Sequence, residues 1–255
     1  MIELSVLLPL YNSKNIAWLA LESLCRQKDI KFKWELVCAE EQDLNPVTKK
    51  EIFNYEKRLE EVNCVNINYI EVKRINLSDK IKLLANNTSD SSYICVFQAG
   101  DAFSQPYRLS QSYDFIKNKG FEWVSSQLGP FYDIKTKKVY LYDRRENPSP
   151  RGLNMATRTE YVKKLPDHGP YRGIDKWIVS NIEKVLNRNL KYVYNTSDYW
   201  KYGFDSHGIN TISGRAKKFE TRPDIYNGTI NLHEYIDADI MNRISECDKY
   251  ITRFK

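Results

Sequence analysis

The sequence lacks any apolar stretch long enough to cross a membrane, and it contains no CxxC pair. Its five cysteines are scattered, so their spacing indicates neither a zinc knuckle nor a dithiol redox motif. An odd cysteine count without such spacing favours a reducing compartment. The N-terminus has no basic segment followed by a long apolar one, as a signal peptide would have. We therefore expect a cytoplasmic protein without a transmembrane segment.

Internal repeats and low-complexity segments are also absent, and no glycine-rich phosphate loop follows the first predicted strand. The missing loop argues against a nucleotidyltransferase. The 255 residues are 42% hydrophobic and 28% charged, which suits one large α/β domain or two small ones. The net charge of +6 favours a polyanionic partner, and it is too small to choose among nucleotides, nucleic acid and an anionic membrane surface. A peripheral position at a membrane therefore stays open.

The first 40 residues alternate between strand and helix signals. Residues 4–10 form an apolar run that ends near Pro9, and apolar residues then recur at helical spacing up to Gln27. A second strand is predicted over 34–39. A strand, a helix and a strand within this length form a βαβ unit, so the two strands should be parallel with a right-handed crossover.

The chain then continues in the same way. Asn45 followed by proline predicts a capped helix that extends to about residue 62. The alternating stretch 65–72 predicts a strand near a sheet edge, and Ser78 is a candidate cap for a short helix. The apolar run 93–97 predicts a strand buried on both faces.

The second half is more mixed. A helix should begin at Pro106 and stop at Gly120, and the stretches 122–127 and 138–141 predict two strands that form a hairpin or a mixed sheet edge. An amphipathic helix is predicted from Ile174 onward. The fold class is therefore α/β, with a Rossmann-like, mostly parallel sheet flanked by helices and a mixed, loop-rich C-terminal half.

Acidic residues and one histidine fall at the predicted ends of strands and helices. In an open α/β sheet, ligands bind at the carboxyl ends of the strands, where carboxylates can hold a metal ion or a substrate hydroxyl. If the strands at 4–10, 34–39 and 93–97 are parallel, the Glu40-Glu41 pair and Asp101 lie together at the carboxyl ends of these strands. The candidates are Glu40 with Glu41, Asp101, Asp175 and His207.

Several segments together resemble the family 2 glycosyltransferases, which have the GT-A fold. Residues 5–12, 21–27 and 34–37, the last followed by an acidic pair, are similar to the N-terminal half of that family. The stretch 97–101 falls where the family carries its DxD-type metal motif. The stretch 173–177 falls where the family carries its catalytic-base motif.

The resemblance extends over about residues 3–213 and implies a domain organisation. It implies a GT-A domain over 1–213, with a nucleotide-binding half at 1–103 and an acceptor-binding half at 104–213. Residues 214–255 lie outside the resemblance, and we expect a basic loop and a C-terminal helix packed on the same domain. That helix could instead form a homodimer or rest on a membrane.

The resemblance also implies roles for single residues at the donor end. It places Pro9, Tyr11 and Glu40 around the nucleotide base, and it places Gly100 beside the nucleotide. Lys80 is a candidate phosphate contact, although a lysine on a helix is more often solvated.

The remaining roles concern the metal and the acceptor. The resemblance implies that Asp101 binds a divalent cation, Mn²⁺ or Mg²⁺, and that His207 is a second metal or diphosphate contact within a segment that closes over the diphosphate. It implies that Asp175 is the base that deprotonates the acceptor.

The chain departs from the family pattern at the acidic motifs. The pair after the second strand is usually aspartate, whereas here it is Glu40-Glu41. The DxD motif usually has two or three acids, whereas here Gln98 and Gly100 replace them and Asp101 remains. With one acid, metal affinity should be weak, or activity should depend less on metal.

The function implied by the resemblance is a metal-assisted, inverting transfer of a sugar from a nucleotide-diphosphate donor, with UDP as the expected nucleotide, to a glycan or other hydroxyl acceptor. Two alternatives remain open. The reduced acidic motif is compatible with a non-catalytic nucleotide- or glycan-binding relative. The positive charge and the basic stretch 215–222 are compatible with a sugar transferase that acts on nucleic acid.

Overall fold

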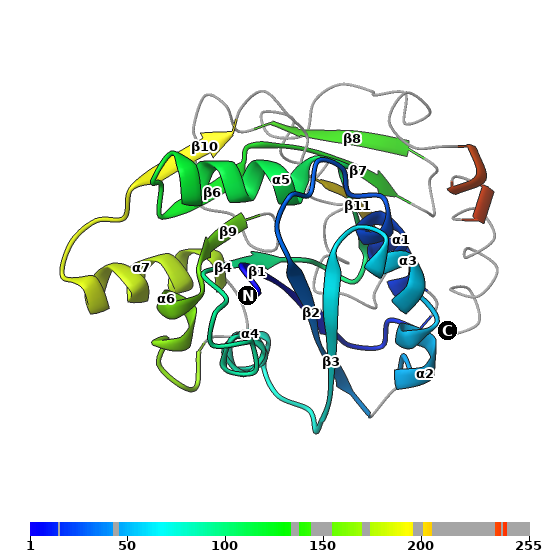
Figure 1. Cartoon of the computed structure of the whole chain (residues 1–255), viewed down its shortest axis with the longest axis horizontal. Coiled ribbons are helices and arrows are strands. Elements are labelled where there is room, and N and C mark those ends of the chain that lie inside the picture. The colour runs from blue at the N-terminus through cyan, green and yellow to red at the C-terminus, as the bar shows by residue number, and fades with distance from the viewer. Residues whose placement is uncertain are drawn as a thin grey trace.

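A central, mostly parallel sheet organises the molecule (Figure 1). The computed structural model describes residues 1–14, 16–42, 46–133, 138–143, 155–169, 174–195, 201–205, 238–240 and 242–243. The main sheet has seven strands in the order β10-β6-β9-β4-β1-β2-β3. Neighbouring strands are parallel except that β9 is antiparallel to both β4 and β6. The strands are β1 (Leu4–Leu10), β2 (Trp34–Glu41), β3 (Cys64–Val72), β4 (Ile94–Phe97), β6 (Trp123–Ser126), β9 (Met155–Arg158) and β10 (Tyr192–Asn195).

Strand β1 lies inside the sheet because its side chains are apolar on both faces. Every residue from Leu4 to Leu10 is buried. Leu8 belongs to the core cluster on one face of the sheet, and its neighbour Leu7 belongs to the cluster on the other face. A strand with two apolar faces is stable only where helices cover both of them. β1 is therefore held between β2 and β4 inside the seven-stranded sheet.

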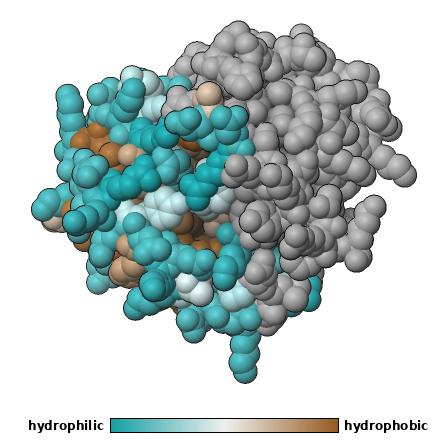
Figure 2. Space-filling view, turned by 90° about the vertical axis from the view of Figure 1, so that its right-hand side faces the viewer, coloured by the Kyte–Doolittle hydropathy of each residue, from teal (hydrophilic) through white to brown (hydrophobic). Residues whose placement is uncertain are grey.

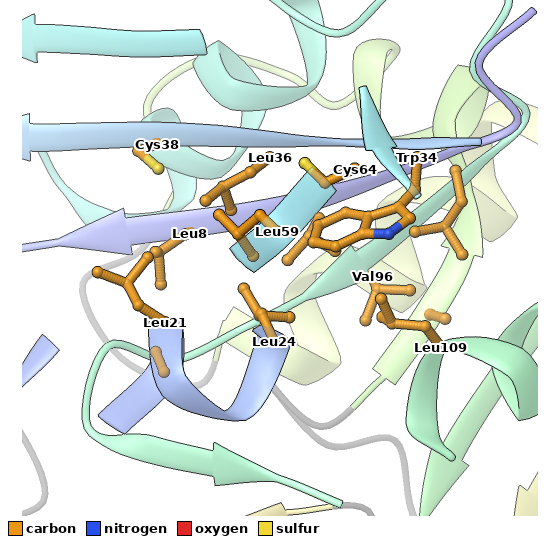
Figure 3. Packing of buried hydrophobic residues seen from close by; sticks show 14 of the residues in the cluster. Leu8, Leu21, Leu24, Trp34, Leu36, Cys38, Leu59, Cys64, Val96 and Leu109 are labelled. Atoms are coloured by element: carbon orange, nitrogen blue, oxygen red, sulfur yellow. The ribbon is translucent and has the colours of Figure 1, made fainter. Parts of the chain in front are cut away.

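Helices cover both faces of the sheet (Figure 1). On one face, α1, α3 and α5 contribute Leu21, Leu24, Leu59 and Leu109, which pack with Trp34 (Figure 3). On the other face, α4, α6 and α7 contribute a second apolar cluster with β4 and β6. The helices are α1 (Ala17–Cys25), α2 (Lys49–Phe53), α3 (Glu56–Glu60), α4 (Leu77–Asn86), α5 (Arg108–Tyr113), the π-helix η1 (Asp114–Asn118), α6 (Thr159–Lys163) and α7 (Ile174–Leu186).

A smaller sheet accompanies the main one. Its order is β5-β11-β7-β8, in which β5 (Ala102–Ser104) directly follows the strand end that carries Asp101. The other strands are β7 (Leu128–Asp133), β8 (Lys138–Asp143) and β11 (Lys201–Asp205). Because β11 pairs with both β5 and β7, residues 128–133 and 201–205 lie in one sheet with the strand that directly follows Asp101.

The described surface on the side of α1, α2 and α3 is mostly hydrophilic, with small separate hydrophobic spots (Figure 2). Near this side, the guanidinium of Arg243 lies 4.1 Å from the ring centroid of Trp18 in α1, and Ile240 is buried. Arg243 therefore lies against α1. None of the described helices is long and apolar enough to cross a membrane.

The α/β class, the parallel β1–β2 pair and the edge position of the third strand are confirmed. Two cap predictions are wrong. Asn76, which precedes α4, accepts the hydrogen bond from the Asp79 N–H, and Ser78 lies inside the helix. The helix predicted to extend from Asn45 to residue 62 is two short helices, and a capping box of Thr48 with Glu51 begins the first of them. The described residues Cys25, Cys38, Cys64 and Cys95 are free thiols.

Of the two alternatives predicted for the second half, the hairpin of 122–127 with 138–141 is wrong, and the position of 138–141 at the edge of a mixed sheet is confirmed. Strand β8 pairs with β7 and not with β6, so the hairpin belongs to the small sheet. Strands β9 and β11 are not predicted as strands from the sequence. Each has four or five residues, and β9 lacks an alternating pattern because it is buried between β4 and β6.

Candidate functional site

The candidate site lies where the central parallel strands end. In the β1–β2 ladder, Leu10 at the end of β1 is paired with Glu40 of β2. Strand β4 runs parallel on the other side of β1, and Asp101 follows its end. The topology therefore brings Glu40 and Asp101 to the same edge of the sheet, as the sequence predicted. Asp101 is 7% exposed.

Lys80 of α4 connects this edge to the helix layer. Its ammonium group lies 2.5 Å from the Oε1 atom of Glu41 and donates a hydrogen bond of 2.7 Å to the carbonyl oxygen of Leu10. Lys80 and Glu41 are both almost fully buried. The interpretation of Lys80 as a solvated helix lysine is therefore wrong, and the acidic pair is buried at both positions. Burying a charge is unfavourable unless it is paired, so Lys80 requires Glu41.

Glu40 stands beside this ion pair without sharing it. The residue is 0% exposed, and among the described residues neither carboxylate oxygen has a partner at ordinary hydrogen-bond geometry, although the backbone N–H of Val47 lies near enough to lower the pKa of the group. Burial raises the pKa of Glu40 from 4.5 to about 8, although the nearby Lys80 charge lowers it in part. At neutral pH the free protein therefore holds Glu40 mainly as the uncharged acid. Buried polar groups normally have partners, so an unpartnered carboxyl group at a ligand-binding edge indicates a place for a ligand.

Tyr11 lies directly after β1, next to these groups. The Lys80 ammonium is 5.9 Å and the Arg74 guanidinium is 5.8 Å from the centre of its ring. Asn12 has a φ of 48°, in the left-handed region that asparagine tolerates, and it turns the chain towards α1. Pro9 lies inside β1, opposite Ala39 in the β1–β2 ladder. The carboxyl end of β1 therefore carries a half-buried aromatic ring, with the cations of Lys80 and Arg74 close to it.

Gly100 makes a close approach possible between the end of β4 and the turn after β1. A Cβ atom at this position would lie 2.9 Å from Cδ2 of Leu10 and 3.4 Å from Oγ of Ser13. An acidic side chain in place of Gly100, as the family motif would have, would therefore require Leu10 to move.

Gln98 is a structural residue within the same motif. It is 0% exposed, and its amide nitrogen donates to the carbonyl oxygens of Ala99 at 2.9 Å and Ala102 at 2.8 Å. Its amide oxygen accepts hydrogen bonds from Ser104 at 2.5 Å and from Arg108 at 2.7 Å. Arg108 is fully buried and also donates to the Phe97 carbonyl, and desolvation lowers its pKa to about 9. Gln98 thus holds the turn that carries Asp101.

These residues do not by themselves form a metal site. Within the described ranges, no group of three His, Cys, Asp or Glu side chains gathers in a way that could hold a metal ion. Asp101 supplies the carboxylate of the 98–101 motif, whereas Gln98 points its amide into the buried network with Ser104 and Arg108. His207, the second predicted ligand, lies outside the described residues.

Asp175 lies in the first turn of α7, where the helix dipole stabilises a negative charge. It is partly buried. Helix α7 packs against α4 and α6, so its N-terminal turn lies on the same face of the sheet as Lys80. The amphipathic pattern from Ile174 predicted the helix correctly. Its packing against α4 could not be inferred from that pattern.

Comparison with known proteins by sequence finds no match, either among protein-family models or among curated proteins. Comparison by structure finds S. aureus TarS at a TM-score of 0.57, with 17% identity over 95% of this chain and 43% of TarS. TarS 1–349 in complex with UDP-GlcNAc gives a TM-score of 0.58, with 13% identity over 98% of this chain and 69% of that one. The mannosyltransferase PcManGT from Pyrobaculum calidifontis, in complex with GDP-Man and Mn²⁺, gives 0.53, with 12% identity over 98% of this chain and 71% of that one.

These structures share the arrangement described above, with a mostly parallel sheet between two helix layers. The chain has the GT-A fold. At these identities the likeness shows the fold alone. The chain spans 43% of the length of the TarS chain.

Three features of the site were not predicted from the sequence. They are the buried ion pair of Lys80 with Glu41, the Gln98–Arg108 network and the hydrogen bonds from the loop before α7 to Asp79. Arg108 offered a signal, because an arginine inside an apolar helical pattern is unusual unless it is held by buried polar partners. Nothing in the sequence indicated which of Glu40 and Glu41 is paired with the lysine.

The raised pKa of Glu40 gives a pH-dependent prediction. Between the ordinary pKa of 4.5 and about 8, the unfolded chain has a charged Glu40 while the folded protein keeps it protonated, so rising pH destabilises the fold. Glu40→Gln removes this titration. We expect urea unfolding to show that the stability of the variant relative to the wild type increases by roughly 1–3 kcal/mol between about pH 5 and pH 8. The exposed neighbour variant Glu71→Gln is the control, and a pH-independent difference for Glu40→Gln would contradict the assignment.

The Gln98 network gives a prediction about stability. Gln98→Leu leaves Ser104, Arg108 and two carbonyl groups without their buried partner. We expect it to lower the free energy of unfolding by roughly 2–4 kcal/mol, measured by urea denaturation. The exposed Gln42→Leu should change it by less than about 0.5 kcal/mol. Equal effects of the two variants would show that Gln98 is not a structural residue.

Proposed function

We propose that the chain is a glycosyltransferase that moves a sugar from a nucleotide-diphosphate donor to an acceptor hydroxyl with inversion at the anomeric carbon. The observation that carries the proposal is the buried carboxyl group of Glu40, which makes no hydrogen bond of ordinary geometry with the described residues and lies at the carboxyl ends of the parallel strands of a GT-A fold. Such an edge is the ligand-binding position in open α/β sheets.

We assign the binding position of the nucleotide base of the donor to the carboxyl end of β2, at Glu40. A nucleotide base offers N–H and carbonyl groups at its rim, and Glu40 has two oxygen atoms for which the described protein provides no partner. The Tyr11 ring lies beside it as a surface for stacking, together with Arg74 and Lys80. UDP sugars are the first donors to consider, because TarS 1–349 of similar fold has been seen with UDP-GlcNAc and with UDP.

Asp175 is assigned as the general base. In the reaction, the acceptor oxygen forms a bond to the anomeric carbon, the bond from that carbon to the diphosphate oxygen breaks, and the diphosphate leaves with the electron pair. The proton of the acceptor hydroxyl passes to the Asp175 carboxylate. A position in the first turn of α7 suits this role, because the helix dipole keeps the carboxylate ionised until the proton arrives.

A divalent cation is implied by the fold, since PcManGT has been seen with GDP-Man and Mn²⁺. The described part of this chain offers a cation the carboxylate of Asp101, without a cluster of three ligands. No step of the proposed reaction is therefore assigned to a metal, and Mn²⁺ is a variable in the binding experiments.

A non-catalytic nucleotide-binding relative is the second candidate. The use of Gln98 as a buried structural residue, in place of an acid, favours it. Release of free nucleoside diphosphate from a nucleotide sugar by the wild-type protein, alone or with an acceptor, would exclude this candidate.

The two carboxylates should separate transfer from donor binding. We expect Asp175→Asn to lower the transfer rate by at least about 10²-fold while donor affinity and thermal stability stay unchanged, because the amide cannot take up the proton. We expect Asp101→Ala to weaken donor binding. Titration calorimetry measures binding, and release of nucleoside diphosphate measures transfer. The partly exposed surface variant Asp114→Asn is the control, and full turnover by Asp175→Asn would refute the base assignment.

A further inference from the structure

The loop before α7 is attached to the first turn of α4. The Oδ1 atom of Asp79 accepts a hydrogen bond of 2.8 Å from the backbone N–H of His168 and one of 3.4 Å from that of Gly169. His168 has a φ of 60°, which costs a non-glycine residue some conformational energy. Its side chain is 94% exposed, so it packs little against the protein. The two backbone hydrogen bonds to Asp79 therefore hold this loop conformation.

Gly169 transmits the contact from α4 to α7. A Cβ atom at this position would lie 2.3 Å from Oγ of Ser78 and 2.7 Å from Cη2 of Trp177. Ser78 is in the first turn of α4, and Trp177 is in α7, two residues after Asp175. The loop backbone thus lies between the two helices at the closest approach that only glycine allows. A shift of the loop against Ser78 would move it against the ring of Trp177.

The Asp79 carboxylate is itself fixed in place. Its second oxygen, Oδ2, accepts a hydrogen bond of 2.8 Å from the Asn76 amide, and the Asp79 N–H donates one of 2.8 Å to Asn76 Oδ1. A second link between the same segments is the ion pair of Lys82 with Asp167 at 2.6 Å. Asp167 is 72% exposed in its side chain, so this pair contributes little.

Lys80, which follows Asp79 in the first turn of α4, makes a different set of contacts. Lys80 joins α4 to Glu41 and Leu10 at the donor end of the edge, whereas Asp79 joins α4 to the loop before Asp175. The first turn of α4 therefore contacts the carboxyl ends of β1 and β2 through Lys80, and the loop before α7 through Asp79.

We propose that Asp79 is a positioning residue for the transfer step: by holding His168 and Gly169 against α4, it sets the first turn of α7 and with it Asp175. The assignment of Asp175 as the base rests on the proposed function, whereas the attachment of the loop by Asp79 does not. Small displacements of a catalytic group can lower the rate about 10²-fold, so loss of Asp79 should act on turnover.

The kinetic test compares Asp79→Ala, Asp79→Asn and Asp167→Asn in the full chain. For Asp79→Ala we expect kcat to fall at least about tenfold, while the KM and the dissociation constant of the donor stay within about twofold. Asp79→Asn keeps an oxygen that can accept both N–H groups, so it should restore most of kcat. Asp167→Asn should behave like the wild type. Equal losses in donor affinity and in kcat, or no loss in either, would overturn the proposal.

A second readout does not depend on activity. Amide hydrogen exchange should become faster at residues 168–169 and in the first turn of α7 in Asp79→Ala, and not in Asp167→Asn. If exchange there is unchanged, the proposal is wrong whatever the kinetics. If exchange is faster and the wild type transfers no sugar, the loop attachment is supported and the proposed function fails instead.

If Asp79→Ala unfolds α4, the variant Gly169→Ala tests the same proposal. It leaves the Asp79–Asn76 hydrogen bonds in place and forces the loop away from Ser78 and Trp177. We expect the same pattern, with reduced kcat, retained donor binding and faster exchange in α7. A Gly169→Ala protein with wild-type exchange in α7 would contradict the proposal.

Discussion

The buried ammonium group of Lys80 is the interaction on which the site depends. It lies where β1 and β2 end, and it is held by the Glu41 carboxylate and the Leu10 carbonyl. Breaking one member of a buried ion pair costs several kcal/mol, so α4 is fixed across the ends of both strands. The Lys80 ammonium is paired with Glu41, and burial raises the pKa of Glu40, which makes no hydrogen bond of ordinary geometry with the described residues. One ion pair thus fixes the helix and also leaves a carboxyl group for a ligand.

The turn after β4 is held by a buried network of Gln98, Ser104 and the Arg108 guanidinium. Where the family motif would place an acid, Gln98 forms four hydrogen bonds that hold the turn before β5. Gly100 allows this turn to pack against Leu10. An acidic side chain at Gln98 or Gly100 would disturb this packing. The presence of a single acid in the stretch 98–101 is therefore consistent with the structure around it. Asp101 is left as the carboxylate that the motif presents.

The sequence predicted the parts of the fold that depend on local patterns. The apolar runs at β1, β2 and β4 and the helical spacing of α1 and α7 specified the central sheet and its parallel order. Glu40, Asp101 and Asp175 were site candidates because they lie at or near the ends of such elements, and their roles stay predictions. The pairing of β7 with β8, the strand β9, the partner of Lys80 and the contacts of Asp79 were not predicted. The β7–β8 hairpin is local in the chain, whereas the other three features are set by contacts between distant segments, such as Asp79 with His168, which no local pattern encodes.

The most direct test of the account is whether a nucleotide sugar binds at Glu40. A thermal-shift screen of nucleotide sugars, with and without Mn²⁺, measures this, because a ligand that binds only the folded state raises Tm. The account predicts that at least one donor raises the Tm of the wild-type protein and that Glu40→Ala abolishes the shift. An absence of any shift in the wild type, or an equal shift in Glu40→Ala, would contradict it.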